Sequence, residues 1–180
     1  MNGCSGMMGH SAANIELCAP LQQLKAEHGP LRNQMDEYKA LAGEIGQDES
    51  QHDWAQPLQA LYEKVHQFMS QLDVHSRKEE DVLFVMMANY IGRHVGPIAV
   101  MEYEHDSAKT LLKSFLETAG SIDGPVAREQ AIQIADTAIQ AQAILTEHFM
   151  KEENVLFPMA EQMLTAEEKE YLQKEIAKIA

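Results

Sequence analysis

The chain has 180 residues, enough for one well-buried core, and nothing in its composition separates a second domain. It carries 14 Lys and Arg against 28 Asp and Glu, a net charge of −14, with the acidic residues spread along the sequence. Because so acidic a surface repels a phosphate backbone, we expect no nucleic-acid partner, and we expect cations to gather near the protein. No apolar run is long enough to cross a bilayer, so no membrane partner is expected.

The two cysteines, Cys4 and Cys18, lie far apart for a metal-binding or redox pair and form no disulfide-rich pattern. Such usage is typical of a reducing compartment. The first 24 residues contain no Lys or Arg and no continuous apolar run, so we expect no secretory signal. The sequence therefore predicts a cytoplasmic protein.

Residues 1–14 are rich in small residues and show no apolar period, which predicts a flexible leader. A second interpretation stays open for this segment. Its soft donors, Cys4, Met7, Met8 and His10, are of the kind that hold Cu(I).

From about residue 15 to residue 45, apolar residues recur at spacings of three and four, which predicts one amphipathic helix. Pro20 suits its first turn, whereas Pro30 removes a backbone hydrogen bond and should bend the helix. His28 lies on the stripe that faces inward. A histidine alone at such a position is more often an ordinary core residue than a ligand.

A second helix is predicted from about residue 54 to residue 91, after a polar loop in which Asp53 can cap the new helix. His75 and Glu79 stand in the middle of its inward stripe, where apolar residues would otherwise lie. Burying an ionised glutamate without a partner is strongly unfavourable, so this pair needs a cation.

A third helix is predicted over residues 97–119 and a fourth over residues 126–151. His105 lies on the apolar face of the third helix. His148 and Glu152 continue the apolar stripe of the fourth. Each half of the chain therefore supplies polar donors to an otherwise apolar interior.

Beyond the fourth helix, Pro158 should either kink it or start a short helix that ends near Leu164. Thr165 and Glu168 have the spacing of a capping box, which predicts a terminal helix within residues 165–180. Its apolar side would pack against the other helices.

Long amphipathic helices joined by short turns predict an all-α fold, an antiparallel up-down-up-down four-helix bundle with a short C-terminal helix. The expected organisation is a leader over residues 1–14, a bundle over 15–164 and a packed helix over 165–180.

An internal repeat supports this organisation. Residues 75–86 recur as residues 148–159 with eight of twelve positions identical, and the Glu-His pair at 27–28 recurs at 104–105. In each longer copy a histidine and a glutamate lie four apart, about 40° around a helix, so both project from one face. The duplication predicts two helical pairs related by a pseudo-two-fold axis.

Six inward side chains from the two pairs should converge on one site and hold two metal ions. The expected ligands are His28, His75, Glu79, His105, His148 and Glu152. Each glutamate can bridge both ions, each ion takes two histidines, and water, hydroxide or oxide can form a further bridge. Nitrogen and oxygen donors without thiolate favour iron, and manganese after it, over a structural zinc.

Other acidic residues lie close to these positions. Glu80 and Glu153 follow their histidines by five positions, about 140° around the helix, which predicts an outer-shell or solvent position. Glu27, Glu104 and Glu147 each precede a ligand histidine and either orient an imidazole, line an ion path or lie on a solvated face. Four further histidines lie off the stripes and are not expected to bind the ions: His10, His52, His66 and His94.

The order lone His, His-x-x-x-Glu, lone His, His-x-x-x-Glu resembles hemerythrin-like, or HHE cation-binding, domains over about residues 17–164. It is most similar to the di-iron domain of bacterial repair-of-iron-centres proteins. The resemblance implies a non-haem di-iron centre with four terminal histidines and with Glu79 and Glu152 as bridges.

The chain departs from two patterns of the family. Oxygen-carrying hemerythrins have His-x-x-x-His on the third helix and an aspartate five residues after the last helix's histidine, where this chain has Lys109 and Glu153. This argues against reversible oxygen storage. Repair proteins tend to carry an N-terminal domain with adjacent cysteines, whereas the leader here contains Cys4.

Three functions stay open from the sequence. The first is a stress-response protein that binds or reduces nitric oxide or delivers iron to damaged iron–sulfur proteins. The second is an oxygen or peroxide sensor, carrier or weak peroxidase, and the third is an iron buffer or sensor. An oxidoreductase acting on nitric oxide, oxygen or peroxide is compatible with the first two, so the sequence does not decide whether the protein is an enzyme.

Overall fold

The computed structural model describes residues 15–180, and all regular structure in this part of the chain is helical. The leader predicted over residues 1–14, and the Cu(I) site considered there, lie outside the described residues. The helices and π-helical turns are, in order, α1 Ala19–Glu44, α2 Ala55–Lys78, η2 Glu79–Leu83, α3 Phe84–Ile91, α4 Pro97–Gly120, α5 Arg128–Lys151, η3 Glu152–Leu156, α6 Phe157–Met163 and α7 Ala166–Ile176.

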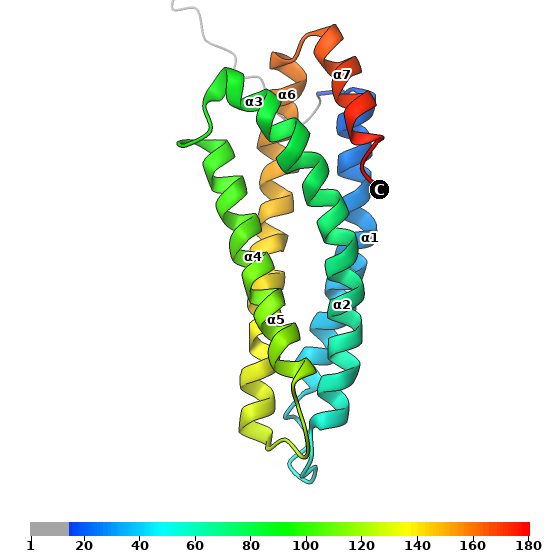
Figure 1. Ribbon diagram of the computed structural model, residues 1–180, viewed down its shortest axis with the longest axis vertical. Coiled ribbons are helices and arrows are strands. Elements are labelled where there is room, and N and C mark those ends of the chain that lie inside the picture. Colours follow the sequence, from blue (N-terminus) through cyan, green and yellow to red (C-terminus); the bar gives the residue numbers. More distant parts are fainter. Residues whose placement is uncertain (1–14) are drawn as a thin grey trace, which may run out of the picture.

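Four long helices, α1, α2, α4 and α5, lie side by side, and successive long helices are joined at alternate ends of the molecule (Figure 1). The short helix α7 lies against α1 at one end. Its Leu172 and Ile176 are fully buried, in one apolar cluster with Leu21 and Leu24 of α1. The C-terminal segment is therefore packed on the long helices through its apolar side.

The inward residues of α1 follow the stripe read from the sequence, with buried residues three and four apart from Leu21 to Ala42. Pro20 lies in the first turn of α1, and the helix continues through Pro30 to Glu44.

The predicted second helix is interrupted in the structure. α2 ends at Lys78, a π-helical turn covers residues 79–83, and α3 continues to Ile91. The same interruption occurs after α5, where a π-helical turn over residues 152–156 leads into α6. A π turn accommodates one extra residue and is frequent at functional sites. The helix predicted from about residue 54 to residue 91 is therefore present, and the π-helical turn within it was not predicted.

Pro158 lies in the first turn of α6, so the structure has the short-helix alternative rather than a kink, and α6 ends at Met163. The predicted capping box is confirmed, because the Thr165 side chain accepts from Glu168 N–H and the Glu168 carboxylate accepts from Thr165 N–H. At the other end of the molecule, Asp53 Oδ1 accepts from the backbone N–H of Ala55, 3.0 Å away, and ties the start of α2 to the loop before α5.

Buried apolar side chains form two clusters along the long axis. The larger cluster includes Leu31, Leu72, Ala108 and Leu145 and extends toward the α4–α5 loop, while the smaller one lies at the α7 end. Between them, the buried side chains of the long helices and of the π-helical turns are mostly polar. The fold thus places a polar layer between two apolar cores.

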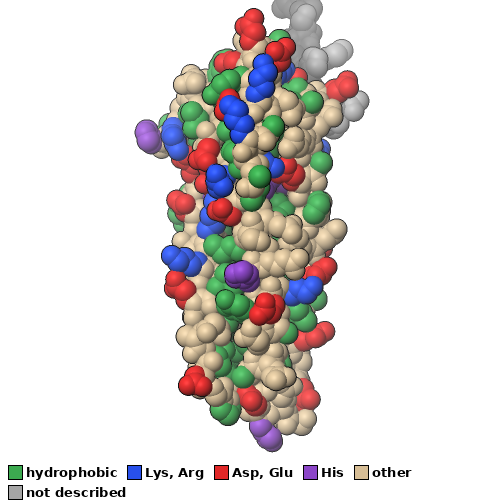
Figure 2. Space-filling model, turned by 45° about the vertical axis from the view of Figure 1, so that its right-hand side comes forward, with side chains coloured by type: hydrophobic (Ala, Val, Ile, Leu, Met, Phe, Trp, Pro, Cys, Tyr) green, Lys and Arg blue, Asp and Glu red, His purple; other side chains and the backbone are tan. Residues whose placement is uncertain are grey.

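Acidic and basic side chains alternate over the face shown in Figure 2, and neither sign covers it alone. Among the described residues, no helix is both long and apolar enough to cross a membrane.

Candidate metal centre

The structure brings all six predicted ligand residues together in the polar layer. None is more than 2% exposed, although four are imidazoles and two are carboxylic acids: His28, His75, Glu79, His105, His148 and Glu152. Burying so many polar groups at one level is unfavourable unless something satisfies them.

The helices α1 and α2 form one helical hairpin, and α4 and α5 form the second. Each glutamate lies between two histidines from different hairpins. Glu152 has its two oxygens 3.3 Å from His28 Nε2 and 3.1 Å from His148 Nε2. Glu79 is placed in the same way, 3.4 Å from His75 Nε2 and 3.6 Å from His105 Nε2. The glutamate of each hairpin therefore faces one histidine of its own hairpin and one of the other.

These donors form two overlapping groups in which the ligand atoms lie within 4.8 Å of one another. Both groups contain Glu79 and Glu152. The histidines of the first are His28 and His75, and those of the second are His105 and His148. Two sets that share both carboxylates are what a pair of carboxylate-bridged ions requires.

The hydrogen bonding of this layer fits bound cations. All four Nε2 atoms and all four oxygens of the two glutamates are buried and have no hydrogen-bond partner. Buried polar atoms without partners are rare in proteins and require an explanation. Eight of the unpartnered buried atoms lie on the convergent edges of these six side chains, where two cations would satisfy them together, and the others are His105 Nδ1 and single atoms of Gln34, Tyr38 and Trp54.

The pKa values of the two glutamates are shifted in opposite directions. Burial and the nearby charge of Glu152 raise the pKa of Glu79 well above its ordinary range. Burial also acts to raise the pKa of Glu152, but the nearby positive charge of His148 outweighs it and lowers that pKa. Two carboxylates this close cannot both be ionised without nearby positive charge, which two bound cations would supply.

The outer nitrogen of one histidine in each hairpin is held by a glutamate of the same hairpin. His75 Nδ1–H donates to Glu27 Oε2 at 2.9 Å, and Lys78 donates to the other oxygen of Glu27 at 2.7 Å. At the equivalent place in the second hairpin, His148 Nδ1–H donates to Glu104 at 3.2 Å, and Lys151 pairs with the same carboxylate.

The other two histidines are held across the hairpins. His28 Nδ1–H donates to Glu153 Oε1 at 2.7 Å, and the Arg32 guanidinium binds the same oxygen. His105 Nδ1 lies 2.7 Å from Glu80 Oε1, which also accepts from Lys109 at 2.8 Å.

Two of these outer carboxylates, Glu27 and Glu80, have a strongly lowered pKa. Burial acts to raise the pKa of Glu27, but hydrogen bonds from His75 and Lys78 outweigh it and lower the pKa to about 2. Burial acts in the same way on Glu80, but its close contacts with His105 and Lys109 outweigh it and lower the pKa to about 2. An ionised acceptor at Nδ1 keeps the proton on that nitrogen and leaves Nε2 as the free donor for a metal.

The π-helical turns explain how adjacent glutamates take different roles. Each turn begins at the inward glutamate, Glu79 or Glu152, and contains the following outer one, Glu80 or Glu153. The first carboxylate of each pair points into the site, and the second reaches a histidine on the neighbouring hairpin. Glu80 and Glu153 therefore each contact an imidazole and are not simply exposed to solvent, and an outer-shell position beside a metal stays a prediction.

Glu27 and Glu104 also contact imidazoles, whereas Glu147 is exposed. The described histidines left out of the site, His52, His66 and His94, are exposed as well.

Four cations of the outer shell were missed in the sequence: Arg32, Lys78, Lys109 and Lys151. The repeat contained a signal for them, because Lys78 and Lys151 are identical in the duplicated motif. Arg32 and Lys109 are 77 residues apart, as His28 and His105 are, so they also occupy equivalent positions of the repeat.

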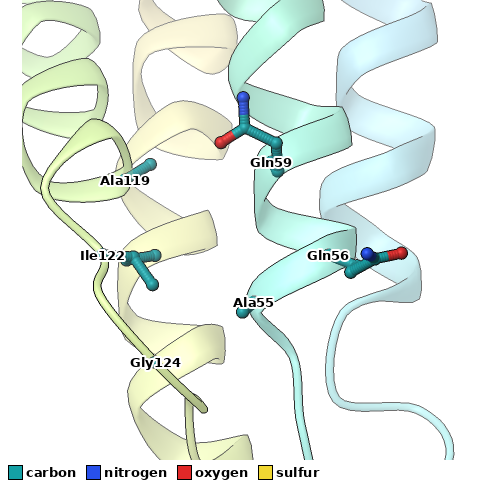
Figure 3. A pocket seen from close by; sticks show the side chains of 6 residues that line it. All are labelled: Ala55, Gln56, Gln59, Ala119, Ile122 and Gly124. Atoms are coloured by element: carbon teal, nitrogen blue, oxygen red, sulfur yellow. The ribbon is translucent and has the colours of Figure 1, made fainter.

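One surface pocket remote from these residues offers no comparable chemistry. The pocket in Figure 3, with a volume of about 210 Å³, lies near the loop after α4, between that loop and the start of α2. No titratable side chain lines it: its residues are Ala55, Gln56, Gln59, Ala119, Ile122 and Gly124.

Comparison with known proteins gives two results. A family model described as Hemerythrin HHE cation binding domain matches residues 19–160, which include all six predicted ligands. Curated proteins named iron-sulfur cluster repair protein YtfE, from Citrobacter koseri, Escherichia coli O1:K1 / APEC and Escherichia fergusonii, are 37% identical to the chain over 92 residues. The match covers 50% of this chain and 42% of each relative, so it spans less than half of their length.

Proposed function

The chain belongs to the hemerythrin HHE cation-binding domain family, and we propose that it is a non-haem di-iron protein that supports iron–sulfur cluster repair and binds or reduces nitric oxide under nitrosative and oxidative stress. We also propose that the six convergent side chains are the ligands, with Glu79 and Glu152 as bridges. The observation that carries the proposal is the set of eight buried, unpartnered donor atoms on those residues.

Iron is the proposed metal for two reasons. The donors are imidazole nitrogens and carboxylate oxygens without thiolate, a set that suits iron or manganese better than a structural zinc. The curated relatives are named for iron–sulfur cluster repair, which favours iron over manganese.

When bound, a pair of irons would supply redox chemistry to a small molecule such as nitric oxide, oxygen or peroxide. The residues of the chain provide the surroundings. The apolar clusters on both sides limit water in the layer, and the outer carboxylates orient the imidazoles with Nε2 inward.

The proposal assigns roles to the parts of the chain. Residues 15–164 would form the metal-binding antiparallel up-down-up-down bundle, and residues 165–180 a helix that covers one end. A role in cluster repair would place the protein in the cytoplasm, in agreement with its cysteine usage, and would make iron–sulfur proteins its partners.

Metal analysis of the protein as purified, followed by anaerobic loading with ferrous iron, tests the centre itself. We expect two irons per chain. Glu152→Ala should keep at most about one, because it removes a donor shared by both ion positions. Two firmly bound irons in this variant would contradict the bridging role.

Nitric oxide tests the proposed reaction. Adding it anaerobically to the ferrous protein should change the optical and electron paramagnetic resonance spectra of the iron, and nitrous oxide should appear if the protein is a reductase. The alternative, a function in oxygen or peroxide handling, predicts no formation of nitrous oxide and a rapid spectral change with oxygen. Chelation separates a third function, iron buffering, which predicts loss of helix content along with the metal.

A further inference from the structure

The two ion positions have the same donor set but different surroundings. Position A is the group containing His28 and His75, and position B is the group containing His105 and His148, with both glutamates shared. The internal repeat makes every residue around A comparable with one residue around B. Any difference between equivalent residues is therefore a difference between the two ions.

His28 of position A is enclosed by aromatic rings. Its ring stacks on Phe149, with centroids 4.2 Å apart and planes 14° apart, and on Phe157, with centroids 5.7 Å apart. Phe149 is also covered by the guanidinium of Arg32, 5.5 Å from its centroid. Rotation of the His28 ring would break these contacts, so packing alone restrains it.

His105 of position B lacks one of these contacts. It stacks on Phe84, the equivalent of Phe157, with centroids 5.7 Å apart. The residue equivalent to Phe149 is Ser76, which is buried and has its hydroxyl directed to the carbonyl of Asp73. Packing therefore restrains His105 less than it restrains His28.

The outer hydrogen bond is also weaker at position B. His28 Nδ1–H makes a well-directed hydrogen bond to Glu153. His105 Nδ1 lies equally close to Glu80, 2.7 Å, but without the geometry of a hydrogen bond. The restraint on His105 thus depends mainly on the charge of Glu80, which Lys109 holds in place.

Solvent reaches the surroundings of position B through an acidic pocket. A surface pocket of about 350 Å³ is lined by Glu80, Asp81, Arg93, Glu102 and Asp106, and Arg93 is paired with Glu102. The residues around position A that are equivalent to Asp81, Glu102 and Asp106 are Asn154, Lys25 and Gly29. A pocket also lies beside position A, where Glu27, His75 and Lys78 are among its lining residues, but Glu27 is its single acidic side chain. The attraction of cations is therefore stronger on the side of position B.

We propose that the two ions are held unequally, that the ion at position B exchanges with solvent faster, and that Glu80 is the positioning residue on which its retention depends. This inference rests on the proposed two-ion centre. Glu80 acts through His105, since its carboxylate touches the outer nitrogen of that ring and not the predicted metal edge. Position A depends less on Glu153, because two phenyl rings still hold His28 when that carboxylate is removed.

Release of ferrous iron to an excess of a ferrous chelator, under anaerobic conditions, tests the proposal. The wild-type protein should release its iron in two phases, each corresponding to one iron per chain. Glu80→Gln should accelerate the fast phase roughly tenfold, since loss of an outer-shell partner commonly costs 10–100-fold in metal affinity. Glu153→Gln is the matched control at the equivalent position, and it should change the slow phase by a smaller factor.

A spectroscopic measurement separates positioning from a general loss of structure. In the Mössbauer spectrum of protein loaded with ⁵⁷Fe, the fast phase should remove one quadrupole doublet and leave the other. Glu80→Gln should alter only the doublet that leaves first. Lys109→Met, which removes the cation beside Glu80, should act in the same direction and is a second test if Glu80→Gln folds poorly.

Several results would overturn the proposal. They are release of both irons in a single phase, an equal or larger effect of Glu153→Gln, and equal changes in both doublets on Glu80→Gln. A wild-type protein that binds fewer than two irons would instead contradict the proposed function, and the unequal positions with it. Release of both irons in one phase would agree with the di-iron function and would contradict only the unequal retention of the two ions.

Discussion

The polar layer and the larger apolar cluster below it are built from the same four long helices, yet they contribute to folding in opposite ways. In the cluster, side chains such as Leu58, Leu61 and Leu112 are fully buried and need no partner. In the polar layer, six equally buried side chains have eight donor atoms without partners. The cluster therefore stabilises the fold by itself, while the layer destabilises it until cations bind.

The comparison shows where stability and function lie in this molecule. Removing apolar atoms from the cluster should lower stability and leave metal binding intact. Removing polar atoms from the layer should abolish metal binding and raise the stability of the metal-free protein. Four predictions test this separation, from the largest expected effect to the smallest.

Removal of the metal should have the largest effect. Ions that bind the folded chain and not the unfolded one stabilise it by about 4 kcal/mol when free iron is 1,000 times its dissociation constant. Thermal unfolding of iron-loaded and chelated protein, followed by circular dichroism, measures this difference. Equal unfolding temperatures would mean that the polar layer does not need cations.

Leu112→Ala should lower the free energy of unfolding by about 2–5 kcal/mol, because it removes apolar contacts and leaves a cavity in the cluster. The variant should still bind two irons at temperatures where it is folded. Chemical denaturation and metal analysis of the same sample measure both effects. Leu116→Ala, at a partly buried position on the same helix, is the control and should cost less. Loss of iron from folded Leu112→Ala would show that the two regions are coupled.

Glu79→Leu should stabilise the metal-free protein by about 1–3 kcal/mol, because it removes a buried carboxyl group whose oxygens have no partner. The same variant should lose the paired ions. Denaturation of the chelated wild-type and variant proteins measures whether the substitution raises or lowers the free energy of unfolding. A less stable variant would indicate that Glu79 is satisfied by the protein itself.

Asp53 should give the smallest effect, at the end of the molecule remote from the polar layer. Backbone N–H groups of Ala55 and Val126 lower the pKa of its carboxyl below the ordinary value of 3.8. The stability from this lowered pKa is present above 3.8 and is lost as the pH falls through the folded value. Asp53→Asn should therefore lose less unfolding free energy than the wild type between pH 5 and pH 2, with both proteins free of metal. Parallel pH profiles would exclude this contribution.

The sequence by itself determined which side chains face inward. Apolar spacing predicted the long helices, and the position of His28, His75 and the other donors within the stripes predicted their burial, because helical period fixes the face of each residue. The repeat predicted two equivalent donor sets, and the resemblance to the HHE family is confirmed over residues 19–160. The ligand roles themselves stay a prediction.

Only the tertiary structure decided which residues meet across helices. Period places Glu80 and Glu153 off the inward stripe, but it cannot say that each touches a histidine of the opposite hairpin. Both glutamates lie in a π-helical turn that begins at the inward glutamate, a departure from the α-helical period that the apolar spacing did not predict. The sequence shows Phe149 in one copy of the repeat and Ser76 at the equivalent position of the other. Only the structure shows that this difference gives His28 a stacked phenyl ring that His105 lacks.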